Sequence, residues 1–259
     1  VFDNTDAGGH RGIGYPHAIA GMGIAEAAGM GRVPTTLEAA QKAITWSCKG
    51  SYEGGDGPWR YGGVTPPDKA DLSVSGWYIM QLKSAKVAGL EVPKGSFEKA
   101  IKFLDATEHK VGKDEGYGAA SEYWYQIGKE TGVAGKHRMC AIGTLGRQFL
   151  GWKKEELEAS VQHFVNMGGV PQWDADGGRV DLYYWYYATL CTFQQGGEIW
   201  KKWNDAMKQA LVTNQRKGGD EDGSWDPVGQ FSGEWGRVGQ TALACLCLEV
   251  YYRYLPMYR

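Results

Sequence analysis

The chain has few cysteines and no cysteine motif. Five occur among 259 residues, none of them in C-x-x-C spacing, and an odd number cannot all pair in disulfides. Four lie in apolar segments, where a free cysteine behaves as a small hydrophobic residue. We therefore expect buried free thiols rather than a disulfide framework at Cys48, Cys140, Cys191, Cys245 and Cys247.

Long apolar runs and basic clusters are also missing. No stretch approaches the roughly 18 apolar residues that cross a bilayer, and the first residues lack the charged and apolar regions of a signal peptide. The net charge is −2, and no Lys/Arg run exceeds two residues, so no basic surface attracts phosphate backbones. We expect a soluble domain without a membrane span or a nucleic-acid partner, in an undetermined compartment. Because the sequence does not begin with Met, one open alternative is that the chain is a processed or truncated piece of a longer protein.

Familiar catalytic motifs are absent as well. There is no G-x-S-x-G nucleophile motif, and the glycines at 8–12 have no preceding strand that would make them a phosphate loop. The histidines outside the predicted helical core show no metal-ligand spacing; they are His10, His109, His137 and His163.

A repeat of about fifty residues is present instead. A Gly- and Asp-rich stretch with an aromatic residue recurs as G-D-G-P-W (55–59), K-D-E-G-Y-G (113–118), V-P-Q-W-D (170–174) and D-E-D-G-S-W-D (220–226). Its aromatic residues, Trp59, Tyr117, Trp173 and Trp225, are spaced 52 to 58 residues apart. A fixed period of this length indicates a repeat architecture.

Each signature precedes an apolar segment of helical length, and a segment with one charged side follows. We predict five buried inner helices and four amphipathic outer helices in alternation, with Ser96 capping one outer helix and residues 119–134 as an insertion. The inner helices align on His17-Ala18, Ser75-Gly76, Cys140-Ala141, Tyr187-Ala188 and Thr241-Ala242.

Helical hairpins of this kind stack as an open solenoid or close into a double ring. An aromatic inner row with little charge favours closure. The sequence therefore predicts an all-α fold, an (α/α) toroid or partial toroid of inner and outer helices with about five repeats. Residues 1–259 would form a single domain, with further N-terminal helices before residue 1 as an open alternative.

The pieces G-D-G-P-W, N-Q-R-K-G-G-D-E-D-G-S-W and T-A-L-A-C-L-C-L-E-V-Y-Y-R-Y-L-P resemble the prenyltransferase and squalene-oxidase repeat. That repeat occurs in terpene cyclases and in protein prenyltransferase β subunits, and the resemblance covers nearly the whole chain. It implies an (α/α) toroid around an apolar cavity, closest to squalene-cyclase-like proteins. It also implies that Trp59 and Trp225 act as surface clasps between repeats, as do Trp173 and Tyr117 with a weaker match.

Terpene cyclases of the protonating type use an Asp from a D-x-D-D motif, which must stay protonated in an apolar cavity. Asp174 and Asp176 supply the first two acids, but Gly177 replaces the last one. With Asp181, they are the candidate catalytic residues. Acidic Gly-rich loops are also ordinary turns, and Asp181 before an inner helix is also a good N-cap, as is Asp71 before another.

Metal chemistry has little support in the sequence. Protein prenyltransferases hold zinc with Asp, Cys and His, whereas here Tyr183 and Gln240 stand where the last two should be. Calcium is a weaker option, because D-A-D-G and D-E-D-G-S-W-D offer alternating oxygens without the Glu of an EF-hand. We expect no resident metal or other cofactor.

The centre of the inner row is the predicted ligand-binding region. Aromatic faces stabilise carbocations and also bind flat apolar molecules. The candidate ligand-binding residues are Trp77, Tyr183, Tyr184, Trp185, Tyr187 and His17.

Three functions remain open at this point. The first is a terpene-cyclase-like enzyme or isoprenoid-binding domain, with an apolar small molecule as its ligand. The second is a non-catalytic repeat scaffold that binds a protein partner as part of a larger protein. A third, weaker reading is a polysaccharide-cleaving toroid enzyme, which needs paired carboxylates such as Glu221 and Asp222 across a cleft.

Overall fold

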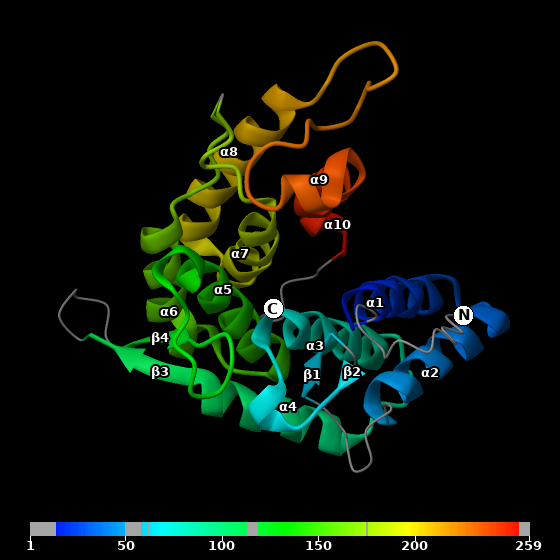
Figure 1. Ribbon diagram of the computed structural model, residues 1–259. Coiled ribbons are helices and arrows are strands. Elements are labelled where there is room, and N and C mark those ends of the chain that lie inside the picture. The colour runs from blue at the N-terminus through cyan, green and yellow to red at the C-terminus, as the bar shows by residue number, and fades with distance from the viewer. Residues whose placement is uncertain (1–13, 50–57, 62, 113–118, 175, 254–259) are drawn as a thin grey trace. The chain divides into compact units, whose positions relative to one another are not determined.

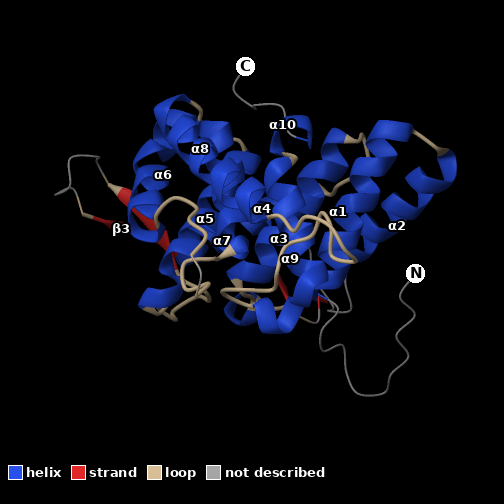
Figure 2. Ribbon diagram, turned by 90° about the horizontal axis from the view of Figure 1, so that it is seen from above, coloured by secondary structure: helices blue, strands red, loops and turns tan. Residues whose placement is uncertain are grey.

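The computed structural model describes residues 14–49, 58–61, 63–112, 119–174 and 176–253. These residues are mostly helical, as predicted (Figures 1 and 2). We keep the names inner and outer from the sequence prediction. The helices at the predicted inner positions are α1 (Gly14–Gly31), α3 (Leu72–Val87), α5 (Val133–Leu150), α7 (Leu182–Gln195) and α9 (Ser232–Leu248). The outer helices are α2 (Pro34–Lys49), α4 (Lys94–Thr107), α6 (Lys154–Gly168) and α8 (Gly197–Asn214), and α10 (Val250–Arg253) ends the described chain.

The chain divides into two compact units. Unit 1 comprises Val1–His109, Glu122–Val133 and Phe149–Gly151, and unit 2 comprises Lys110–Ser121, Ala134–Gln148 and Trp152–Arg259. Within unit 1, inner helix α3 packs against α1 and against the outer helices α2 and α4. Within unit 2, inner helix α7 packs against α9 and against the outer helices α6 and α8. Each unit therefore repeats one two-layer arrangement.

The burial of the two helix types follows their sequences. Every residue of α7 from 182 to 192 is buried, including five consecutive aromatic residues. Helix α8 instead buries one side only, through Trp203, Met207, Ala210 and Leu211, at the spacing of one helical face. Helices α3 and α7 are thus buried on nearly all sides, as predicted for inner helices. For α1 and α9 that prediction was wrong, because in the described structure each buries residues at the spacing of one helical face only.

The signature tryptophans Trp59 and Trp225 make the same contacts in different units, but both are buried, so the expected surface position was wrong. The Trp59 indole Nε1 donates to the Ser47 carbonyl on outer helix α2 at 2.8 Å, and its backbone N donates to Ser75 Oγ on inner helix α3 at 3.2 Å. In unit 2, the Trp225 indole donates to the Leu211 carbonyl on α8 at 2.8 Å.

The backbone N of Trp225 completes the parallel by donating to Thr241 Oγ1 on α9 at 3.2 Å. Ser75 and Thr241 occupy the same place in the predicted alignment of inner helices, so the register of these two repeats is correct. Trp173 differs, because its ring lies 6.4 Å from that of Trp185. Tyr117 lies outside the described residues.

Two short hairpins accompany the helices. Strand β1 (Trp59–Arg60) pairs antiparallel with β2 (Gly63–Val64), next to the 3-10 turn η1 (Pro67–Lys69). Strand β3 (Glu108–Val111) pairs with β4 (Ala120–Tyr123), which lies in the predicted insertion.

The prediction that Ser96 caps α4 was wrong. Pro93, with φ fixed near −57°, starts α4 earlier and leaves Ser96 buried in its first turn.

All five cysteines are free thiols, four of them buried. Among the described residues, no helix has both the length and the apolar character to cross a membrane.

Candidate functional site

Asp181 lies at the N-terminus of α7 and makes two kinds of contact. Its Oδ1 accepts a hydrogen bond from the Tyr184 backbone N at 3.0 Å, so the predicted N-cap is confirmed. Its Oδ2 accepts from Arg138 Nε at 2.5 Å and lies 3.3 Å from His137 Nε2. Helix α5 supplies both of these cationic or polar partners.

These partners determine the charge of the carboxyl. Burial by itself would raise the pKa of Asp181, because it disfavours the charged form. The hydrogen bond from His137, the charge of Arg138 and the capped N–H group outweigh burial, and the pKa lies below its ordinary value. A carboxyl held in the ionised form is a poor proton donor. The geometry therefore favours capping and charge pairing over the acid role.

The aromatic run that follows Asp181 faces several neighbours. The Tyr184 hydroxyl donates to the Phe164 carbonyl on α6 at 3.2 Å, and its ring lies 5.5 Å from that of Trp203 on α8. The Trp185 ring contacts Trp173 in the preceding loop. These two candidate ligand-binding residues are thus packed against outer helices and a loop. A ligand contact for either one stays a prediction.

Tyr183 faces a different set of rings. Its ring centroid lies 6.0 Å from those of Phe231 and Trp235, which are 5.2 Å apart. We call Tyr183, Phe231 and Trp235 the aromatic cluster. Tyr187 packs behind Tyr183 at 5.2 Å, and the Arg138 guanidinium lies 5.3 Å from the centre of the Phe231 ring. Phe231 and Trp235 are half-buried, so the cluster is partly open to solvent.

Unusual backbone conformations hold the cluster together. Phe231 has φ +61°, in the left-handed region that side chains rarely adopt, and Gly236 interrupts α9 with φ +57°. The preceding loop is fixed to α7 because the Gln230 backbone N donates to the Val180 carbonyl at 2.8 Å. Gly229 permits this approach, since a Cβ there would lie 2.1 Å from the Val180 oxygen. The chain therefore holds the Phe231 ring beside Tyr183 at a conformational cost.

The acidic loop before α7 is a turn. Asp174 Oδ1 accepts from the Arg179 backbone N at 3.1 Å, and its carbonyl accepts from Gly177 N. Asp176 is exposed. No group of three or more His, Cys, Asp or Glu side chains that could hold a metal occurs in the described part of the chain. At the position compared with a zinc ligand, the Gln240 amide donates to the Val228 carbonyl at 2.7 Å.

The remaining candidates, His17 and Trp77, lie in unit 1. His17 Nε2 lies 2.9 Å from Ser47 Oγ and 3.1 Å from the Ala43 carbonyl, and Ser47 donates to Gln81. Burial lowers the pKa of His17, so this histidine fits a hydrogen-bonded core residue. Trp77 is buried on α3. The structure thus groups Asp181 with Tyr183 and Tyr187, and it keeps His17 and Trp77 in the other unit.

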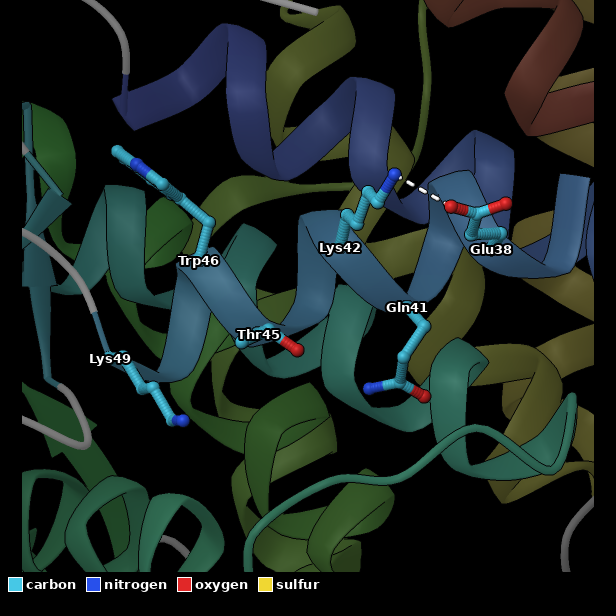
Figure 3. Close-up of a pocket in the computed structure, with 6 residues that line it drawn as sticks. All are labelled: Glu38, Gln41, Lys42, Thr45, Trp46 and Lys49. Atoms are coloured by element: carbon cyan, nitrogen blue, oxygen red, sulfur yellow. Dashed lines mark ion pairs between the residues drawn. The ribbon is translucent and has the colours of Figure 1, made fainter. Parts of the chain in front are cut away.

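A shallow hollow of about 420 Å³ runs along α2. Figure 3 shows its six lining residues, all from this one helix, with Lys42 paired to Glu38 at 2.7 Å. The Trp46 ring, at one end, is tilted at 46° to the His17 ring, with ring centroids 4.0 Å apart. The hollow is an open helix surface, with no convergent set of polar groups from several elements.

Comparison of the chain with protein-family models, curated proteins and solved structures finds no match. A functional proposal therefore depends on the chemistry of the sites.

One further acid, Asp71, occupies the same place on α3 that Asp181 has on α7. It caps the helix, and its Oδ1 accepts from the Val74 backbone N at 2.9 Å and from Ser73 Oγ at 2.8 Å. Burial dominates here and raises its pKa, the opposite of Asp181. From the sequence alone, both acids are predicted to be N-caps, with no difference between them. The only local signal is that hydroxyl residues follow Asp71 and aromatic residues follow Asp181.

Proposed function

We propose that this chain is a squalene-cyclase-like helical repeat domain that binds an apolar, isoprenoid-type ligand at the aromatic cluster. The fold that we propose is the (α/α) toroid or an arc of one. The alternation of the largely buried helices α3, α5 and α7 with the amphipathic helices between them supports it, and so does the recurrence of the Trp59 clasp at Trp225. A single domain over residues 1–259 belongs to the same proposal.

The observation that carries the ligand proposal is the strained presentation of Phe231. A non-glycine residue in the left-handed region costs on the order of 1 to 3 kcal/mol, and such residues concentrate at functional sites. In this protein the strained backbone of Phe231 places its half-buried ring beside Tyr183 and Trp235, with the Arg138 guanidinium over the ring. Partly open aromatic faces suit a flat or branched apolar ligand.

Binding is favoured over cyclisation at this cluster. A protonating cyclase needs a neutral carboxyl beside its substrate. Asp181, the acid next to Tyr183, is instead paired with Arg138 and has a lowered pKa.

A protein-binding scaffold is the second candidate, and exposed apolar residues favour it. Val238 on α9 is 84% exposed, and Tyr252 on α10 is 91% exposed. The polysaccharide-cleaving alternative has less support, because the Glu221 carboxylate pairs with Arg237 at 2.8 Å and the Asp222 carboxylate accepts a hydrogen bond from the Gly218 backbone N at 2.7 Å.

Replacing Trp235 with alanine is expected to weaken binding of geranylgeraniol about tenfold, because one aromatic wall of the cluster is lost. Intrinsic fluorescence titration measures the affinity. Trp200→Ala is the matched control, since Trp200 is also half-buried in unit 2 and packs against Phe193 and Tyr251 in a separate aromatic group. Equal affinity of both variants and wild type would contradict binding at the aromatic cluster. Absence of binding to all three proteins would reject the isoprenoid-type ligand.

A further inference from the structure

A group of hydroxyls surrounds the second buried acid, in unit 1. The Tyr15 hydroxyl donates to Ser73 Oγ at 2.5 Å, and Ser73 in turn donates to Asp71 Oδ1. The hydroxyls of Tyr61 and Tyr125 are 2.9 Å apart. The Tyr125 phenol lies beside Asp71 and, by hydrogen-bonding interaction with the carboxyl, lowers its pKa against the larger effect of burial, although it does not reach Oδ2 at hydrogen-bonding distance and angle. We call Tyr15, Tyr61, Ser73 and Tyr125 the hydroxyl cluster.

The second carboxyl oxygen of Asp71 is what the cap does not explain. Asp71 is 0% exposed, and among the described residues its Oδ2 has no partner at hydrogen-bonding distance and angle. Buried polar atoms in native proteins almost always have such a partner, from the protein or from a bound molecule. Val74 and Ser73 satisfy only Oδ1. The cap therefore accounts for half of this carboxyl.

The surroundings of Asp71 determine whether a charged or an uncharged group would bind there. Burial disfavours the carboxylate and raises the pKa of Asp71, which weakens any attraction for a cation. The nearby positive charge of Arg60 further opposes a cation, and a buried acid gives no attraction for an anion. An uncharged group that both donates and accepts hydrogen bonds suits this position best.

The tyrosines form the more exposed side of this site. Tyr61 is 40% exposed, and Tyr15 and Tyr125 are half-buried, whereas Ser73 and Asp71 are buried behind them. The rings of Tyr15 and Tyr61 are tilted at a centroid distance of 5.7 Å and offer apolar faces beside the hydroxyls. Aromatic faces next to hydroxyls match an alcohol carried on an apolar body or on a sugar ring.

We propose that Asp71 and the hydroxyl cluster form a binding site for an uncharged hydroxyl group of a small ligand, either an isoprenoid alcohol or a sugar. The site lies in unit 1, so it is separate from the aromatic cluster of unit 2 and does not depend on ligand binding there.

Infrared difference spectroscopy of the whole protein tests this site through the carboxyl itself. Geraniol and methyl glucoside are the hydroxyl-bearing probes, and myrcene is the hydrocarbon that matches geraniol. We expect one of the two hydroxyl probes to shift a carboxyl band of the wild-type protein, and myrcene to leave it unchanged. The probe that causes the shift shows whether the site binds an isoprenoid alcohol or a sugar.

Asp71→Asn assigns the band and keeps the cap, because Asn is as good an N-cap residue as Asp. This variant should lose the shift and bind the active probe about tenfold more weakly, while the matched Asp181→Asn variant retains both. Tyr125→Phe provides a second test that leaves the carboxyl in place, and it should weaken binding of the same probe. The proposal fails if neither hydroxyl probe shifts the band, if myrcene shifts it equally, or if Asp71→Asn retains the shift.

Discussion

Replacing Trp225 with alanine is expected to lower the free energy of unfolding by about 4 kcal/mol, the loss typical of truncating a fully buried tryptophan. Trp225 is 1% exposed, and its indole bonds to the Leu211 carbonyl on α8. Truncation removes that bond and leaves a cavity between an outer and an inner helix. Chemical denaturation followed by circular dichroism measures the change.

Two comparisons separate the clasp from general packing. Trp59→Ala in unit 1 should cost a similar amount, because Trp59 is 0% exposed and makes the corresponding bonds to Ser47 and Ser75. Trp200→Ala removes a half-buried indole that makes no such bond within the described part of the chain, and it should cost clearly less. If the Trp200 variant were as unstable as the two clasp variants, the clasp would have no special role in the repeat.

Replacing Arg138 with methionine is expected to destabilise the protein by about 3 kcal/mol at neutral pH, because the buried Asp181 carboxylate loses its main cation. The lowered folded-state pKa fixes the pH dependence. The stabilisation that the ionised Asp181 contributes to the folded state is complete above the pKa of an unfolded Asp, about 3.9. It is lost as the pH falls through the lower pKa that Asp181 has in the folded protein. The difference between wild type and variant should therefore shrink in acid.

The double variant Arg138→Met with Asp181→Asn tests the charge argument. Asn keeps the cap and removes the unpaired charge, so stability at neutral pH should partly return relative to Arg138→Met alone. Denaturation curves at neutral and acidic pH measure all of these proteins. A double variant less stable than Arg138→Met would show that packing of the arginine, and not its charge, stabilises this region.

Much of the helical organisation could be predicted because it depends on local pattern. Continuous apolar segments predicted the inner helices, and charged faces predicted the outer ones. Asp71 and Asp181 were expected to cap α3 and α7, and both accept the backbone bonds of a cap. The alignment of Ser75 with Thr241 anticipated their equal bonds to the clasp tryptophans.

The properties of the sites could not be predicted in the same way. Asp71 and Asp181 have pKa shifts of opposite direction because their partners differ, and Arg138 is 43 residues before the acid that it pairs with. The aromatic cluster depends on Phe231 adopting φ +61°, which no local pattern indicates. Hydropathy also could not tell that Tyr184 packs against outer helices while Tyr183 faces Phe231.

The most direct test of ligand binding by this domain is native mass spectrometry of the purified protein, followed by organic extraction and identification of what is released. Wild-type protein produced in several hosts should carry an apolar, isoprenoid-type molecule in a one-to-one complex, and Trp235→Ala should carry much less. Wild-type protein that is free of any such molecule from every host, and that stays free after incubation with geranylgeraniol, would contradict the proposed function and favour the scaffold.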